Sequence, residues 1–146
     1  WSENQTDAPD IKERNLMLVH VNKYDQIAVQ GEMVTVSQLK DRAKEWVLNR
    51  EDDKNLPEKK DEDIDIIGKY AVSQGVISLQ NDRGTSYEMY IKVQNELTRA
   101  FNEIRDELSK AHFGKNFADL EKAQQDAVAK AVPMKISEAE PRNIKK

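Results

Sequence analysis

Short hydrophobic clusters alternate with longer polar stretches along the chain, and four of the clusters have the length of strands. Residues 16–21 are apolar on both faces of an extended chain, as is typical of a buried strand. Residues 27–29 follow a polar turn and alternate with their neighbours, so the first two clusters predict a hairpin. Residues 76–80 predict a third strand. Residues 134–137 predict a last strand at a sheet edge, which Pro141 would prevent from extending.

Two further stretches repeat apolar residues at the three- and four-residue spacing of a helix face. One begins near Thr35 or Ser37, since Thr35 matches a capping box with Gln38, and it ends near Asn49. The other covers residues 119–131 and ends before Pro133, because proline breaks a helix. Their apolar faces consist of Leu39, Ala43, Trp46 and Val47 in the first helix, and of Leu120, Ala123, Ala127, Val128 and Ala131 in the second.

A longer amphipathic helix is predicted from about residue 86. Thr85 and Glu88 match a capping box at its start, and Gly114 is a typical helix stop. The stripe predicts that Tyr87 packs in the first turn of the helix, and Gln94 is its one polar member. The stripe consists of Tyr87, Tyr90, Ile91, Gln94, Leu97, Phe101, Ile104 and Leu108.

The order strand, strand, helix, strand, helix, helix, strand predicts an α+β fold, in which helices pack on one face of a small mixed β-sheet. Residues 1–14 are polar and are expected to be a linker. Residues 15–141 are expected to form a single domain, followed by a tail at residues 142–146. Within residues 50–65, 12 of 16 residues are charged. This composition predicts a solvated insertion rather than a packed element.

Composition narrows the classes of partner. The 146 residues carry a net charge of −4, so no broad positive surface is available for nucleic acid. The absence of cysteine excludes disulfides and thiolate metal sites. No apolar run reaches the roughly 18 to 20 residues that cross a bilayer, and the chain begins at Trp1 rather than methionine. A truncation is therefore expected.

Candidate chemistry is sparse. The alternating acids at positions 61, 63 and 65 are spaced like calcium ligands, but Ile66 stands where the sharp turn of such a loop needs glycine. His20 and His112 lack the spacing of a zinc site, and there is no phosphate-binding glycine loop or nucleophile elbow. We therefore predict no catalytic residue, no metal ligand and no cofactor. Turn and cap chemistry accounts for the polar residues that follow Asp82.

One stretch resembles a known family. An apolar strand ending at Asp82, a short loop, and Tyr87 opening an amphipathic helix are similar to the signature of the ExbD/TolR family of biopolymer-transport proteins. The order of elements over residues 15–101 follows the same family, and residues 134–141 resemble the ending of a branch found in Bacteroidetes-type bacteria. Residues 80–81 are Gln-Asn, where many members carry Arg-Ala, so no role of that arginine is transferred.

The resemblance implies a location and a set of partners. It implies one transmembrane helix upstream of Trp1 in the bacterial inner membrane, with this domain in the periplasm. A membrane aspartate in that helix would carry protons within a ring of ExbB- or TolQ-like subunits. The periplasmic domain would be a non-catalytic module that transmits motion to a TonB- or TolA-like protein, and it would form a homodimer.

Five residues are the candidate site for signature or partner contacts: Asp82, Tyr87, Lys135, Ile136 and Ser137. The last three fall in the predicted edge strand, whose unpaired backbone groups could receive a strand of a partner.

Two alternatives stay open at this level. The same fold could bind cell-wall glycan or peptide without a membrane partner. A hydrolase that uses Asp82, Tyr87 or a histidine is the other alternative, and an Asp82→Asn change would then abolish turnover.

Overall fold

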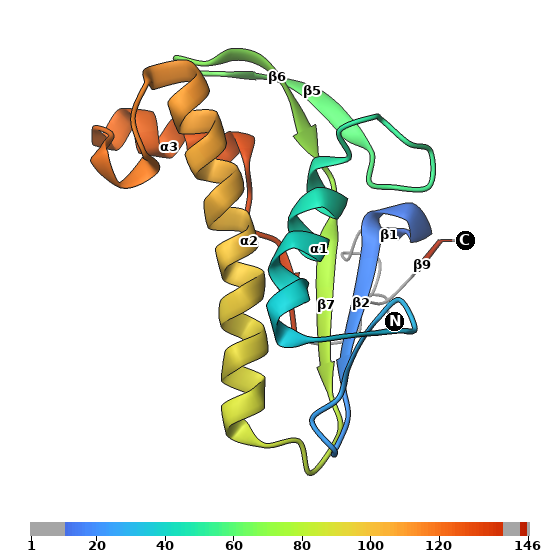
Figure 1. The fold of residues 1–146 in the computed structure, drawn as a ribbon. Helices are drawn as coiled ribbons and strands as arrows, with labels where there is room; N and C mark the ends of the chain where they lie inside the picture. Colours follow the sequence, from blue (N-terminus) through green and yellow to red (C-terminus); the bar gives the residue numbers. More distant parts are fainter. Residues whose placement is uncertain (1–10, 139–143, 146) are drawn as a thin grey trace, which may run out of the picture.

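The computed structural model describes residues 11–138 and residues 144–145. Within these residues, five strands form a mixed sheet in the order β4–β3–β2–β7–β8 (Figure 1). The strands β2, β7 and β8 run parallel to one another, whereas β3 and β4 form an antiparallel hairpin against β2. The five strands are β2 (Leu16–Val21), β3 (Ile27–Val29), β4 (Glu32–Val34), β7 (Val76–Asn81) and β8 (Ile136–Ser137).

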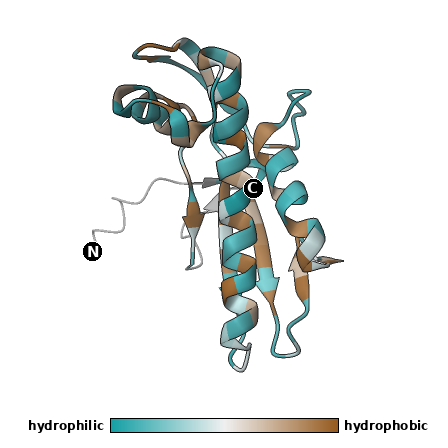
Figure 2. Cartoon of the chain, turned by 60° about the vertical axis from the view of Figure 1, so that its left-hand side comes forward, coloured by the Kyte–Doolittle hydropathy of each residue, from teal (hydrophilic) through white to brown (hydrophobic). Residues whose placement is uncertain are grey.

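Two helices, α1 (Val36–Leu48) and α2 (Tyr87–Phe113), pack on one face of this sheet (Figure 1). The predicted α+β fold is therefore confirmed. The helices carry mainly hydrophilic residues, whereas hydrophobic residues concentrate on the strands (Figure 2). None of the helices within the described residues is long and apolar enough to span a bilayer.

The core lies between the sheet and these helices. In β2, Met17, Val19 and Val21 are buried, whereas Leu18 and His20 are exposed. The expectation that β2 is buried on both faces therefore holds only for the face that meets the helices. In β7, Ile77 and Leu79 are fully buried on the same side.

The predicted start and end of α1 are both correct. Thr35 and Gln38 form the capping box, in which the Thr35 N–H donates to Gln38 Oε1 at 3.0 Å. Asn49 ends the helix in a left-handed conformation with φ of 42°. Its buried side-chain amide donates to the carbonyl groups of Asp53 and Pro57 at 3.1 and 2.9 Å, so it also shapes the following turn. The four apolar residues predicted for α1 are all buried.

The cap of α2 is shifted by one residue from the prediction. Ser86, not Thr85, is the N-cap, because Ser86 Oγ accepts a hydrogen bond from the Met89 N–H at 3.1 Å. The hydroxyl of Thr85 donates instead to the carbonyl oxygens of Val21 and Asn22, both at 3.1 Å. Thr85 therefore attaches the start of the helix to the end of β2.

The prediction of a solvated insertion at residues 50–65 is wrong for its second half. Residues Lys59–Ile64 form β5, which pairs in antiparallel register with β6 (Gly68–Ser73). The charged side chains at positions 60–63 are exposed, while Ile64 and Val72 join the core. Backbone pairing and two apolar anchors thus stabilise a strand whose composition is typical of a loop.

The linker expected at residues 1–14 is wrong where the structure describes it. Residues 1–10 lie outside the described residues, but β1 (Ile11–Lys12) pairs in parallel with β9 (Ile144–Lys145), and a 3₁₀ turn, η2, covers Glu13–Asn15. Arg14 Nε donates to the Leu56 carbonyl at 2.7 Å. The expected tail is therefore also a strand at residues 144–145, whereas residues 139–143 and 146 lie outside the described residues.

The last helix, α3 (Lys122–Ala131), follows the 3₁₀ turn η3 (Phe117–Asp119). It begins three residues later than predicted and ends at the predicted residue. Ala127, Val128 and Ala131 are buried as expected, but Ala123 is exposed. The segment after α3 carries the chain back to the sheet, where β8 becomes its outermost strand beside β7.

Candidate functional site

The predicted edge strand is the strand β8. Ile136 pairs with Ile77, and the Ile77 N–H donates to the Lys135 carbonyl at 2.9 Å. In a parallel ladder, a residue forms hydrogen bonds with the two neighbours of its register partner. The backbone groups of Lys135 and Ser137 that bond to Ile77 therefore point toward β7. The N–H and C=O of Ile136 consequently point to the outer side of the sheet. No hydrogen bond reaches them within residues 11–138 and 144–145.

The side chain of Ile136 points in a different direction from these backbone groups. It is half-buried and packs against the core. The side chain of Ile136 therefore anchors β8 to the core, while its backbone N–H and C=O stay available for hydrogen bonds to a further strand. Strand addition requires this arrangement.

The residue after β8 fastens this edge to α2. Gln94 Nε2 donates to Glu138 Oε2 at 2.6 Å, and the Tyr90 hydroxyl also bonds the Glu138 carboxylate. This hydrogen bond, helped by desolvation, raises the pKa of Tyr90. Gln94, the polar exception in the apolar stripe of α2, is thus a contact to the end of the edge strand.

Asp82 lies where the parallel strands β2 and β7 end. Its Oδ1 is 2.8 Å from His20 Nε2, and its N–H donates to the Val21 carbonyl at 2.9 Å. The carboxylate of Asp82 and the imidazole of His20 are each about half exposed, at 48% of their side-chain area. Asp82 therefore holds the two strand ends together and still faces solvent.

Tyr87 departs from the prediction. It was assigned to the packed stripe of α2, but 77% of its surface is exposed. The reason is its position in the first turn: the N-cap Ser86 is held by Asp25, whose carboxylate accepts from the Ser86 N–H and hydroxyl at 3.1 and 3.0 Å. This contact fixes the start of α2 against the turn after β2. Its ring lies 6.3 Å from that of Tyr90, measured between centroids.

The structure connects Tyr87 to the end of the edge strand through Tyr90 and Glu138, which were not among the predicted site residues. Tyr87 contacts Tyr90, Tyr90 bonds Glu138, and Glu138 directly follows β8. We call this set, Tyr87, Tyr90, Ile136 and Glu138, the edge surface. Gln94, the polar residue inside the apolar stripe of α2, was the sequence feature that could have indicated this surface, because a half-buried polar side chain needs a hydrogen-bond partner.

Metal ligands do not converge within the described residues, where no group of three histidine, aspartate or glutamate side chains could hold an ion. Asp61 of β5 is 3.6 Å from Lys69 of β6, in an exposed cross-strand ion pair. His112 lies beside Phe113 near the end of α2, with ring centroids 6.2 Å apart.

Comparison of the chain with models of known protein families gives no match, and comparison with curated proteins gives none either. The resemblance to the ExbD/TolR family thus rests on the residues that carry it.

Proposed function

We propose that this chain is the periplasmic domain of a proton-motive-force-driven energy-coupling complex, of the ExbB–ExbD–TonB or TolQ–TolR–TolA type. In this proposal it is a non-catalytic interaction module that supports transport across the outer membrane. An upstream helix would attach it to the inner membrane beside an ExbB- or TolQ-like subunit. The observation that carries the proposal is the short edge strand β8, in which Ile136 offers an outward N–H and C=O.

Edge pairing gives the partner a defined register. An extended segment of a TonB- or TolA-like protein, or the same strand of a second copy, would continue the sheet through backbone hydrogen bonds. The described part of β8 has only two residues, so the backbone alone gives little affinity. Tyr87 and Tyr90 would add side-chain contact beside it, because aromatic residues contribute strongly at interfaces.

The strand arrangement also suits the transmission of force. β2, β7 and β8 are adjacent and parallel, so a pull that enters near β2 and leaves through β8 loads two ladders of hydrogen bonds in shear. The contact between Glu138 and Gln94 braces the end of β8 against α2. The domain would accordingly move as a rigid unit when the membrane subunits move.

The test is an Ile136→Pro variant of the natural full-length protein, expressed with its membrane subunit and its TonB- or TolA-like partner. Proline removes the outward N–H without removing a hydrogen bond to β7. We expect co-purification of the partner, and dimerisation measured by sedimentation, to fall at least ten-fold.

Two control variants isolate the edge. Ile136→Val keeps the N–H and should bind normally. Met33→Pro removes an outward N–H from the opposite edge strand, because Met33 faces Ala28 in a pair without hydrogen bonds, and it should also bind normally. Normal binding by a folded Ile136→Pro variant would exclude this edge as the contact.

The exposed Tyr87 favours a second candidate, the binding of cell-wall glycan. A tyrosine ring that is 77% exposed can stack on the apolar face of a sugar. Sedimentation with isolated peptidoglycan, lost on Tyr87→Ala and retained on Ile136→Pro, would support this candidate over the energy-coupling module.

A further inference from the structure

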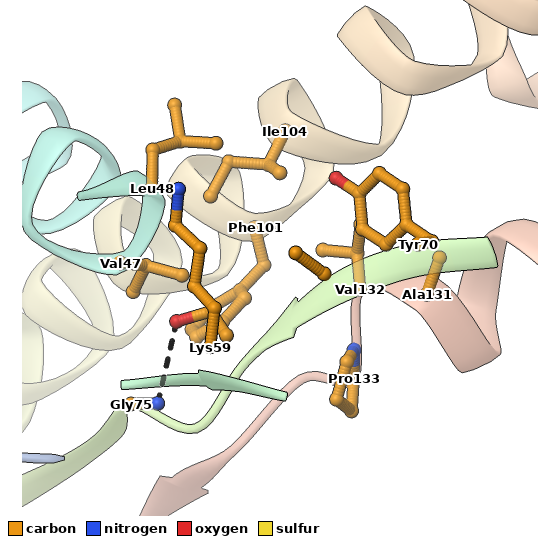
Figure 3. Close-up of a pocket in the computed structure, with 12 residues that line it drawn as sticks. Val47, Leu48, Lys59, Tyr70, Gly75, Phe101, Ile104, Ala131, Val132 and Pro133 are labelled. Carbon is orange, nitrogen blue, oxygen red and sulfur yellow. Dashed lines mark hydrogen bonds between the residues drawn. The ribbon is translucent and has the colours of Figure 1, made fainter. Parts of the chain in front are cut away.

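A small cavity lies where the β5–β6 hairpin meets α1, α2 and the segment after α3 (Figure 3). Its volume is about 80 Å³. Its wall comes from residues far apart in the sequence: apolar side chains line one part, among them Val47, Leu48, Phe101, Ile104 and Val132, and polar groups of the hairpin line the rest. Packed protein cores leave few spaces larger than a water molecule, so a cavity of this size at the junction of four elements is unusual.

Three polar side chains of the hairpin line this space: Lys59, Tyr70 and Ser73. The Ser73 hydroxyl already accepts a hydrogen bond from the Gly75 N–H at 3.4 Å. Lys59 extends from β5 past Val47, and its ammonium ends beside Leu48, while the hydroxyl of Tyr70 points toward Ile104 (Figure 3). Both residues are half-buried. Within residues 11–138 and 144–145, neither the Lys59 ammonium nor the Tyr70 hydroxyl has a hydrogen bond or an ion pair. Neither donor is fully buried, so both groups can reach solvent and remain available to a ligand that supplies an acceptor.

The charges around the cavity single out Lys59. Lys44 is 2.6 Å from Glu107, and Arg50 is 2.7 Å from Glu45, so these neighbouring cations are already neutralised. Burial, with a smaller contribution from the charge of Glu107, raises the pKa of Tyr70. Its hydroxyl therefore stays protonated at neutral pH and can donate a hydrogen bond.

We propose that this cavity binds a short aliphatic carboxylate of about two to four carbons, with its carboxylate on Lys59 and Tyr70 and its hydrocarbon tail among the apolar residues. The chemistry follows from the wall: a carboxylate accepts from both free donors, and its bond to an ammonium is charge-assisted. The size follows from the volume, since an engineered cavity of about 150 Å³ holds benzene and this one has 80 Å³. The proposed carboxylate site does not depend on the proposed function.

The experiment is a titration of this chain with acetate, propionate and butyrate at constant ionic strength, followed by the methyl resonances in NMR spectra. The methyl groups of Val47, Leu48 and Ile104 report on the cavity directly. We expect saturable shifts confined to these residues, with dissociation constants roughly in the millimolar range because so small a ligand has few atoms to contribute. Butyramide, which has the shape of butyrate without its charge, should bind at least ten-fold more weakly.

Three variants distinguish binding in the cavity from nonspecific attraction of anions to the protein. Lys59→Met keeps the length of the side chain and should weaken butyrate binding at least ten-fold, and Tyr70→Phe should weaken it several-fold. Lys60→Met removes the same charge from the adjacent exposed position and should leave binding unchanged. Equal weakening by Lys60→Met, equal binding of butyramide, or the absence of saturable shifts at the three methyl residues would each overturn the proposal.

Discussion

Gly75 provides a sharp test of how the hairpin is attached to the body of the domain. It lies between β6 and β7, it is buried, and it faces the ring of Trp46 on α1. A β-carbon at this position would lie 2.8 Å from Trp46 Cζ3 and 3.1 Å from Pro57 Cγ. Both atoms belong to rigid rings inside the packed region, so neither can move aside without disturbing its neighbours. We predict that Gly75→Ala destabilises the fold.

The size of the effect follows from two opposing contributions. Overpacking of a core by one methyl group costs typically about 1–3 kcal/mol. Replacing glycine by alanine also restricts the unfolded chain, which stabilises the folded state by about 0.4–1 kcal/mol. The 2.8 Å approach to Trp46 places the overpacking cost in the upper half of its range, about 2–3 kcal/mol, so the expected net loss in the free energy of unfolding is about 1–2.6 kcal/mol. In a domain of this size it corresponds to a fall in Tm of roughly 2–10 °C.

Urea denaturation followed by circular dichroism measures this loss, and a second variant identifies its cause. Trp46→Phe removes the outer ring atoms that the new methyl group would meet. The cost of Gly75→Ala should fall by at least half in that background, because the two residues are in contact. A Gly75→Ala variant that is neutral or stabilising, or that costs the same in both backgrounds, would contradict the close packing of Gly75 against the Trp46 ring.

Substitutions at three other residues test separate contacts. Ser86→Ala should cost about 1–2 kcal/mol in urea denaturation, because the N–H of Met89 loses its cap; no change would exclude Ser86 as the N-cap. Asn49→Ala should cost about 2 kcal/mol or more, since it leaves the buried Pro57 carbonyl without the Asn49 amide and removes the acceptor of the Asp53 N–H. Asn49→Gly should recover only the part of this cost that comes from the left-handed backbone at position 49, and an unchanged stability of Asn49→Ala would contradict these contacts. Lys40 holds the pKa of Glu103 below its ordinary value of 4.5, so this pair stabilises the fold above that pH and loses its effect as the pH falls below it. Glu103→Gln should thus lower stability by at most about 1 kcal/mol at pH 7, because Glu103 is about a third exposed, and the difference from the wild type should shrink as the pH falls through the lowered pKa of Glu103. A difference that does not change with pH would contradict this ion pair.

Elements whose pattern matches their environment were predictable. Residues 16–21 form β2, and the Thr35–Gln38 capping box begins α1, because burial and capping act through the residues that carry the pattern. The 27-residue helix α2 was predicted from its stripe and ends at Gly114 as expected. In each case a local signal agrees with the tertiary contacts.

Elements that depend on distant contacts were missed. β5 consists mostly of exposed charged residues, so its strand conformation comes from pairing with β6 rather than from its own hydrophobic pattern. The cap of α2 moved from Thr85 to Ser86 because the backbone at the end of β2 accepts the Thr85 hydroxyl.

The candidate site was predicted only in part. The place of Ile136 in an edge strand followed from the sequence, whereas the direction of its N–H required the register with Ile77. The exposure of Tyr87 depends on how Asp25 holds the start of the helix, and helical spacing does not contain that information.

Protease accessibility of the natural gene product most directly tests the assignment to a periplasmic energy-coupling complex. We expect the product to stay with the inner membrane, and residues 15–138 to be protected in intact cells and digested once the outer membrane is opened. Full protection of these residues after the outer membrane is opened, with the product recovered in the cytoplasmic fraction, would contradict this assignment.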